Sequence, residues 1–154
     1  MSNSMLENSQ WTEKDFDTMQ WHDCKIYAIA FDEKKDELLF DIDYILEWIE
    51  PKNNESYFKF RVAPSTLIFR NVYDINLSLQ SLVVQIDGIY RENPVRPKNA
   101  NAIGEDVEYD WSIETTNGHI SFKSVGYRQV LRSQPQIQDH QQIERGSLFY
   151  EASK

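Results

Sequence analysis

Residues 107–124, VEYDWSIETTNGHISFKS, carry the clearest structural signal in the chain. Apolar and polar side chains alternate strictly over residues 107–114, and successive side chains of a strand point to opposite faces of a sheet. The stretch therefore predicts a strand with one apolar face and one acidic face. Asn117-Gly118 follows it, a pair that favours a two-residue hairpin turn in which both turn residues have positive φ. We therefore expect residues 119–124 to return antiparallel to the first strand.

Similar short runs of β-forming residues recur on both sides of this hairpin. They predict strands at residues 24–31, 37–45, 57–62, 66–72, 75–79, 82–90 and 127–131. Pro64 is expected to end a strand or to lie at a sheet edge. Residues 91–105 hold two prolines and show no periodicity, so they are expected to form a long loop. Thr12, followed by acidic residues, is expected to cap a short helix.

These elements predict a mainly β fold: an antiparallel sandwich or a curved, barrel-like sheet of about eight strands, with a short helix near one terminus. A chain of 154 residues matches a single domain that buries roughly 70% of its unfolded surface. The sequence predicts a flexible leader at residues 1–10, which are polar and aperiodic, and a single β-rich domain at 11–154.

Cysteine usage and hydropathy favour a cytoplasmic setting. Cys24 is the only cysteine, which excludes an internal disulfide framework and fits a reducing compartment. No run approaches the roughly 18 apolar residues of a membrane span, and the N-terminus lacks the basic and apolar regions of a signal peptide. We therefore expect no membrane association.

The charge of the chain is negative and regional. The net charge is −9, which argues against a nucleic-acid partner because phosphate binding requires exposed Lys and Arg. Residues 32–55 carry nine acidic side chains against three lysines, and residues 105–114 carry five acidic side chains and no basic one. Like charges on neighbouring strands cost about 0.2–1 kcal/mol per opposed pair, so an acidic sheet face is easier to explain if a basic partner docks on it. Solubility alone is the competing explanation.

That argument defines a candidate partner-binding surface, with Trp48 as an aromatic anchor. Its residues are Asp41, Asp43, Glu47, Trp48, Glu108, Asp110 and Glu114. Asp41 and Asp43 would share a strand face, where with Glu47 they could hold a hard cation or act as an acid/base pair. The alternative is that the two aspartates are simply the solvent side of a half-buried strand.

Other chemistry has weaker support. Cys24 could be a nucleophile activated by a histidine, but its apolar strand pattern favours a place in the core. His22 and Asp23 would point to opposite faces if both lay on a strand, so they are not expected to pair. No zinc-ligand spacing, Gly-rich phosphate loop or nucleophile elbow is present. We accordingly assign no catalytic residue, no metal and no cofactor.

Several short motifs resemble those of a family of uncharacterised bacterial β-rich proteins. They are Trp21-His22-Asp23, residues 37–44 (ELLFDIDY) with Trp48, Val62-Ala63-Pro64, Asn71-Val72 and Gly126-Tyr127. The likeness spans most of residues 20–150 and is similar in style to immunity proteins of polymorphic toxin systems, small acidic domains that bind and block a toxin. The resemblance implies a bacterial cytoplasmic protein, and together with the charge argument it makes a basic protein or a toxin the expected partner.

Two alternatives to a protein-binding module remain open. The concave side of a curved sheet, rich in aromatic residues, could form a small-molecule or enzymatic pocket. An exposed strand edge could instead join copies of the chain into a homo-oligomeric structural protein.

Overall fold

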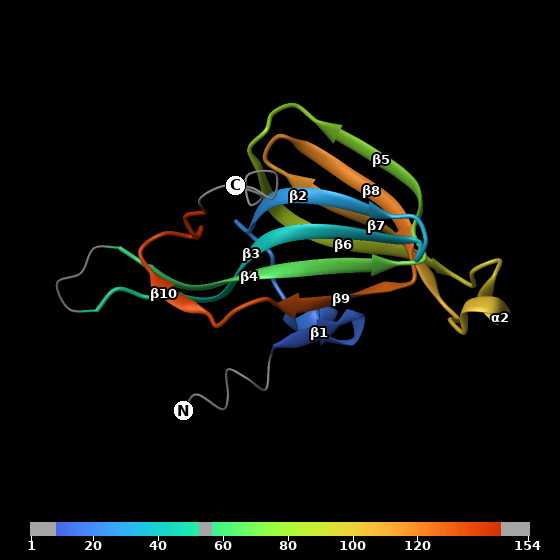
Figure 1. Ribbon diagram of the computed structural model, residues 1–154, viewed down its shortest axis with the longest axis horizontal. Coiled ribbons are helices and arrows are strands. Elements are labelled where there is room, and N and C mark those ends of the chain that lie inside the picture. The colour runs from blue at the N-terminus through green and yellow to red at the C-terminus, as the bar shows by residue number, and fades with distance from the viewer. Residues whose placement is uncertain (1–8, 53–56, 146–154) are drawn as a thin grey trace, which may run out of the picture.

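The computed structural model describes residues 9–52 and 57–145 of the chain. Within these residues, ten strands form one antiparallel sheet in the order β1-β9-β4-β3-β2-β6-β7-β8-β5, and β10 pairs with β4 (Figure 1). The strands are β1 Gln10–Thr12, β2 Lys25–Asp32, β3 Glu37–Ile49, β4 Lys59–Arg70, β5 Tyr73–Leu79, β6 Val84–Val95, β7 Glu108–Thr115, β8 Gly118–Ser124, β9 Gly126–Leu131 and β10 Gln136–Gln138. The prediction of a mainly β, antiparallel and curved sheet is confirmed.

The sheet folds back on itself where β2 meets β6. Only two residue pairs, Lys25 with Gln85 and Ile26 with Val84, join these strands. The half formed by β6, β7, β8 and β5 therefore turns across the half formed by β2, β3, β4 and β9, and β6 and β7 pass behind β2 and β3 (Figure 1). The apolar faces of both halves meet in one core.

Aromatic side chains fill that core. The ring of Phe69 lies 4.6 Å from Phe122, 5.1 Å from Trp111 and 5.6 Å from Tyr127, measured between centroids. The indole nitrogen of Trp111 donates to the Ser124 carbonyl oxygen at 2.9 Å, so this buried polar group has a partner. The aromatic residues expected to line a concave pocket thus pack against one another, and the pockets described below lie at the surface.

The N-terminal helix forms as a 3₁₀ helix, η1 Glu13–Thr18. Thr12 and Asp15 make a reciprocal capping box, in which the Asp15 carboxylate accepts from the Thr12 amide at 3.0 Å. The expected leader at residues 1–10 falls outside the described residues as far as residue 8, and β1 begins at Gln10.

Pro64 does not end a strand, so the two strands expected on either side of it are one strand, β4. The Pro64 carbonyl oxygen accepts from the Arg132 amide at 2.8 Å, which shows that its missing N–H faces β9 and β10. The β4 ladder has a gap there, because Ser65 pairs with Leu131 of β9 and Val62 pairs with Gln136 of β10. A proline is tolerated where no ladder hydrogen bond is required.

Residues 91–105 are not the expected loop. β6 continues through Val95 and pairs with β7 across a bulge between Glu92 and Val95, where Asn93 takes a φ of 57°. A short helix, α2 Ala100–Ile103, follows and ends at Gly104. Bulges accommodate residues that interrupt a regular ladder, and Pro94 sits in this one.

The β7–β8 hairpin is present, but its turn differs from the expectation. Thr115 pairs with Gly118, so the two turn residues are Thr116 and Asn117. Gly118 carries the positive φ, at 141°.

No helix in the described part of the chain is long and apolar enough to cross a membrane.

Candidate functional site

Asp41 and Asp43 anchor the end of the described chain to the sheet instead of facing solvent. Both carboxylates bind one guanidinium: Arg145 donates to Asp41 at 2.9 and 3.0 Å and to Asp43 at 2.7 Å. Asp43 is fully buried and also accepts from the Ile143 amide at 2.6 Å. The residues around Ile143 and Arg145 thus form a C-terminal latch across β3.

The latch extends to β2 and to the chain after β9. The Tyr27 hydroxyl donates to Asp43 at 2.8 Å, and the Arg145 guanidinium lies 3.7 Å from the centre of the Tyr27 ring. Burial, with the bond to Asp43, raises the pKa of Tyr27. Arg132 donates to Asp41 at 2.5 Å. Because cations already neutralise both aspartates, the pair is neither a free acid/base pair nor the solvent side of a strand.

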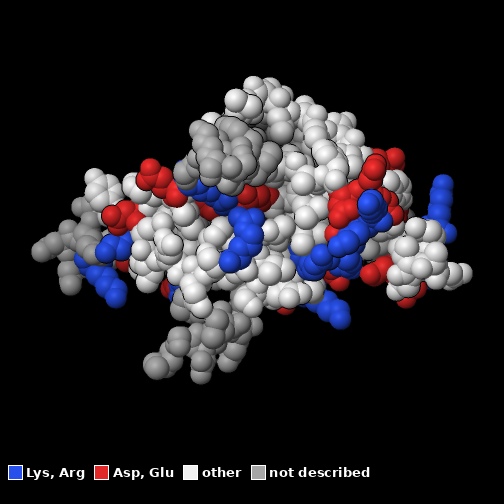
Figure 2. Space-filling model, viewed as in Figure 1, with Lys and Arg blue, Asp and Glu red and all other residues white. Residues whose placement is uncertain are grey.

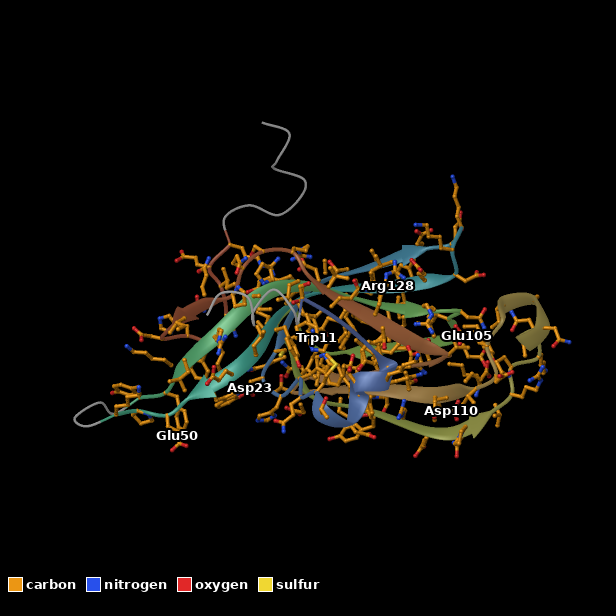
Figure 3. All side chains as sticks on the ribbon, turned by 90° about the horizontal axis from the view of Figure 1, so that it is seen from below. Trp11, Asp23, Glu50, Glu105, Asp110 and Arg128 are labelled. Atoms are coloured by element: carbon orange, nitrogen blue, oxygen red, sulfur yellow. The ribbon has the colours of Figure 1, made fainter. Side chains whose placement is uncertain are left out.

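The remaining predicted carboxylates do not join Asp41 and Asp43 on one acidic face. Glu50 lies at one end of the molecule, whereas Glu105 and Asp110 lie at the other (Figure 3). Acidic and basic side chains also lie next to one another over the face seen in Figure 2. Glu47 pairs with Arg61, and Asp110 binds Lys123 at 2.5 Å, which together with Asn93 lowers the pKa of Asp110. The carboxylates of the 32–55 and 105–114 regions therefore do not form one shared acidic sheet face among the described residues.

Glu108 departs furthest from the expectation of an exposed acidic strand face. It is only 5% exposed, and its Oε2 accepts from the Tyr73 hydroxyl. That hydrogen bond is the main cause that raises the pKa of Tyr73 to about 12. Glu114, on the same strand, is exposed as predicted.

Trp48 is exposed and belongs to an aromatic surface at the end of the β3–β4 hairpin where the two strands are connected. Trp48 and Phe58 are each 42% exposed, and their rings meet edge to face at 6.1 Å. Phe60 lies beneath, 5.1 Å from Trp48, and the His22 ring stacks on Trp48 at 6.3 Å. We call these four residues the hairpin surface.

A recess of about 320 Å³ adjoins the hairpin surface. Its walls include Gln20, His22, Tyr44, Glu47 and Trp48. An aromatic anchor beside a recess of this size offers both a contact for a partner's side chain and a cavity to receive one.

His22 and Asp23 are closer than a strand would allow. They lie in a turn before β2, where Asp23 has a φ of 69°, and His22 Nε2 is 3.5 Å from Asp23 Oδ1. The Asp23 carboxylate also accepts a hydrogen bond from the Gln141 side chain at 2.8 Å, so it binds the C-terminal segment. Cys24 is fully buried, as expected, and burial raises the pKa of its thiol to about 12, which makes it a poor nucleophile.

Sequence reasoning missed Arg145 and Phe58. Arg145 follows a Gln-rich stretch with no periodicity, and nothing local indicates that it returns to β3. The alternating pattern places Phe58 on the same strand face as Phe60 and Val62. It does not predict that Phe58 is exposed while Phe60 and Val62 are buried.

Together these features define a small curved β protein with an exposed aromatic hairpin end and internally paired carboxylates. Comparisons of the chain with protein-family models, with curated proteins and with solved structures found no match.

Proposed function

We propose that this chain is a protein-binding module that docks a basic protein through the hairpin surface, in the manner of an immunity protein that blocks a toxin in the bacterial cytoplasm. The exposure of Trp48 and Phe58 carries the proposal. Interface energy concentrates in a few aromatic and Arg anchors, and Trp and Tyr are enriched among them.

Packing around Trp48 supports the choice of this surface. Phe60 beneath and His22 alongside hold the indole in place, so little side-chain entropy remains to be lost when a partner binds. Glu47 and Glu50 are exposed on the same hairpin, and the net charge of the chain is −9. Long-range attraction would therefore speed the approach of a basic protein.

The carboxylates of Asp41 and Asp43 take a different role from the one first expected of them. Asp41 and Asp43 are neutralised by Arg132 and Arg145, and direct contact with a partner would require the C-terminal latch to open. The proposed contact residues are therefore Trp48 and Phe58, with Glu47 and Glu50 at the rim.

Site-specific photo-crosslinking in the native cells tests this proposal. A photoreactive phenylalanine analogue replaces Phe58, and the matched control places it at Phe31, which is 61% exposed on β2. We expect a covalent adduct with one basic protein from position 58 and not from position 31. Equal capture at both positions, or no adduct at position 58, would contradict the proposal.

The captured protein then provides a quantitative measurement. We expect Trp48→Ala to weaken its binding by at least about tenfold, Phe31→Ala to leave binding unchanged, and added salt to weaken binding. If the partner is a toxin, its expression should arrest growth, and co-expression of this chain, but not of the Trp48→Ala variant, should restore it. Full affinity of the Trp48→Ala variant would overturn the assignment of the surface.

A further inference from the structure

A polar pocket lies at the opposite end of the molecule from the hairpin surface, where the β2–β3 turn, the β4–β5 turn and α2 come together (Figure 1). Its volume is about 590 Å³, within the range of small-molecule sites. We call it the Glu108 pocket.

One carboxylate oxygen of Glu108 lacks a hydrogen-bond donor in this pocket. Its side chain lines the cavity and is 5% exposed. Oε2 accepts from the Tyr73 hydroxyl, but Oε1 is buried and has no hydrogen-bond partner in the described part of the chain. A buried carboxylate oxygen without a donor is costly, and such groups in native proteins call for an explanation.

The neighbouring cation does not meet that requirement. Lys123 also lines the pocket, but its ammonium group binds Asp110 at 2.5 Å. Two further acidic residues, Asp36 and Asp74, line the same cavity, and their side chains make no ion pair or hydrogen bond among the described residues. With Lys123 engaged and Lys98 as the other basic residue of the wall, the pocket has an excess of negative charge.

The arrangement favours an organic cation over a metal ion. No three His, Cys, Asp or Glu side chains within the described ranges converge closely enough to hold a metal. A guanidinium or alkylammonium group carries several N–H donors that point in different directions, so it can reach carboxylates that are too far apart to share one ion.

The backbone around the pocket holds these groups in place. Asp36, Asn71 and Asp74 all adopt left-handed φ values, of 57°, 51° and 54°. The Val72 amide donates to the Asp36 carbonyl oxygen at 3.0 Å, which joins the β2–β3 turn to the β4–β5 turn. A backbone hydrogen bond therefore holds together the two turns that carry Asp36 and Asp74.

We infer that the Glu108 pocket binds a small organic cation, whose guanidinium or ammonium group donates to Glu108 Oε1 and is surrounded by the carboxylates of Asp36 and Asp74. This inference is independent of the proposed protein-binding function, because it uses other residues at the other end of the molecule.

Titration of the full chain with agmatine, followed by calorimetry and by backbone amide NMR, tests the inference. We expect saturable binding with shifts centred on Tyr73, Glu108 and Lys123. The matched ligand pair is arginine amide and citrulline amide, in which an uncharged urea replaces the guanidinium, and we expect citrulline amide to bind at least about tenfold more weakly. No localised shifts at millimolar agmatine, or equal binding of the two amides, would overturn the inference.

Substitutions of single carboxylates test which of them binds agmatine. Glu108→Gln should weaken agmatine binding by at least about tenfold, and Asp74→Asn should weaken it by a smaller factor. Glu114→Gln is the control, because Glu114 is an exposed carboxylate on the same strand. An equal loss in Glu114→Gln and Glu108→Gln would indicate general charge attraction and contradict a specific site.

Two further measurements separate a ligand-binding role from a structural one and identify the source of the cation. If Glu108 serves to bind a ligand, we expect the Glu108→Gln variant to unfold at no lower temperature than the parent chain. A lower unfolding temperature with unchanged agmatine affinity would show that Glu108 has a structural role. A capped Gly-Arg-Gly peptide that binds as well as agmatine would indicate a protein side chain as the natural occupant. Binding of agmatine alone would indicate a free small molecule.

Discussion

Cys24 shows how burial, and not sequence context, sets the reactivity of a single side chain. His22 is two residues away, yet the thiol faces the core and has no exposed surface. Burial raises its pKa from 9.0 to about 12 because the interior disfavours the thiolate, and the Ile45 backbone hydrogen bond only partly opposes that effect.

The raised pKa of Cys24 predicts a loss of stability at alkaline pH. Below the unfolded pKa of 9.0 both states hold the proton, so the full stability is present; above it only the unfolded state ionises, until the folded pKa near 12 is reached. Between these values the thiol should lower the free energy of unfolding by up to about 1.4 kcal/mol per pH unit. Urea unfolding at several pH values checks this against Cys24→Ala, whose stability should decline less steeply. Parallel declines would show that Cys24 does not contribute.

Glycines at element ends show how local geometry restricts substitution. Gly118 opens β8 at a φ of 141°, and a Cβ there would overlap the Ser78 carbonyl oxygen of the neighbouring strand β5. Gly104 ends α2 at a φ of 71°, with no atom within 4 Å of where a Cβ would be. The two positions share a positive φ and differ in the space around them.

That difference predicts unequal effects of the same substitution. Gly104→Ala should cost about 1 kcal/mol, the penalty for placing a side chain at positive φ. Gly118→Ala should cost about 2–3 kcal/mol, because the backbone of β5 must also move. Denaturant midpoints of the two variants measure the difference, and similar losses would contradict the crowding argument.

On the scale of the whole molecule, the C-terminal latch joins parts of the chain that lie about a hundred residues apart. Arg145 binds Asp41 and Asp43 across separations of 104 and 102 residues. The Asp43 carboxylate is fully buried, so it depends on Arg145, Tyr27 and the Ile143 amide for compensation.

Removal of the Arg145 charge should therefore destabilise the fold. We expect Arg145→Gln to cost about 2–3 kcal/mol, because it leaves a buried carboxylate with fewer donors. The control is Arg96→Gln, since Arg96 pairs with Asp106 at 2.8 Å where both side chains are exposed, and such pairs contribute within about 1 kcal/mol. Equal unfolding midpoints of the two variants would show that the latch does not stabilise the sheet.

Sequence patterns predicted the parts of this protein that depend on neighbours along the chain. Alternation placed the β7–β8 hairpin and most strands, the capping residues placed η1, and the apolar run around Cys24 placed it in the core. Each of these features depends on side-chain direction or hydrogen bonding within a few residues, so the local amino-acid types are enough to predict it.

Only the tertiary structure decided what the charged and aromatic residues do. The path of the chain after β10 brings Arg145 onto Asp43, while the sheet buries Glu108 beside Tyr73 and leaves Trp48 exposed at a hairpin end. By itself the sequence determined a mainly β, acidic chain with one buried thiol. Whether a carboxylate is paired, buried or available to a ligand depends on which distant strands become neighbours, and local alternation carries no information about that choice.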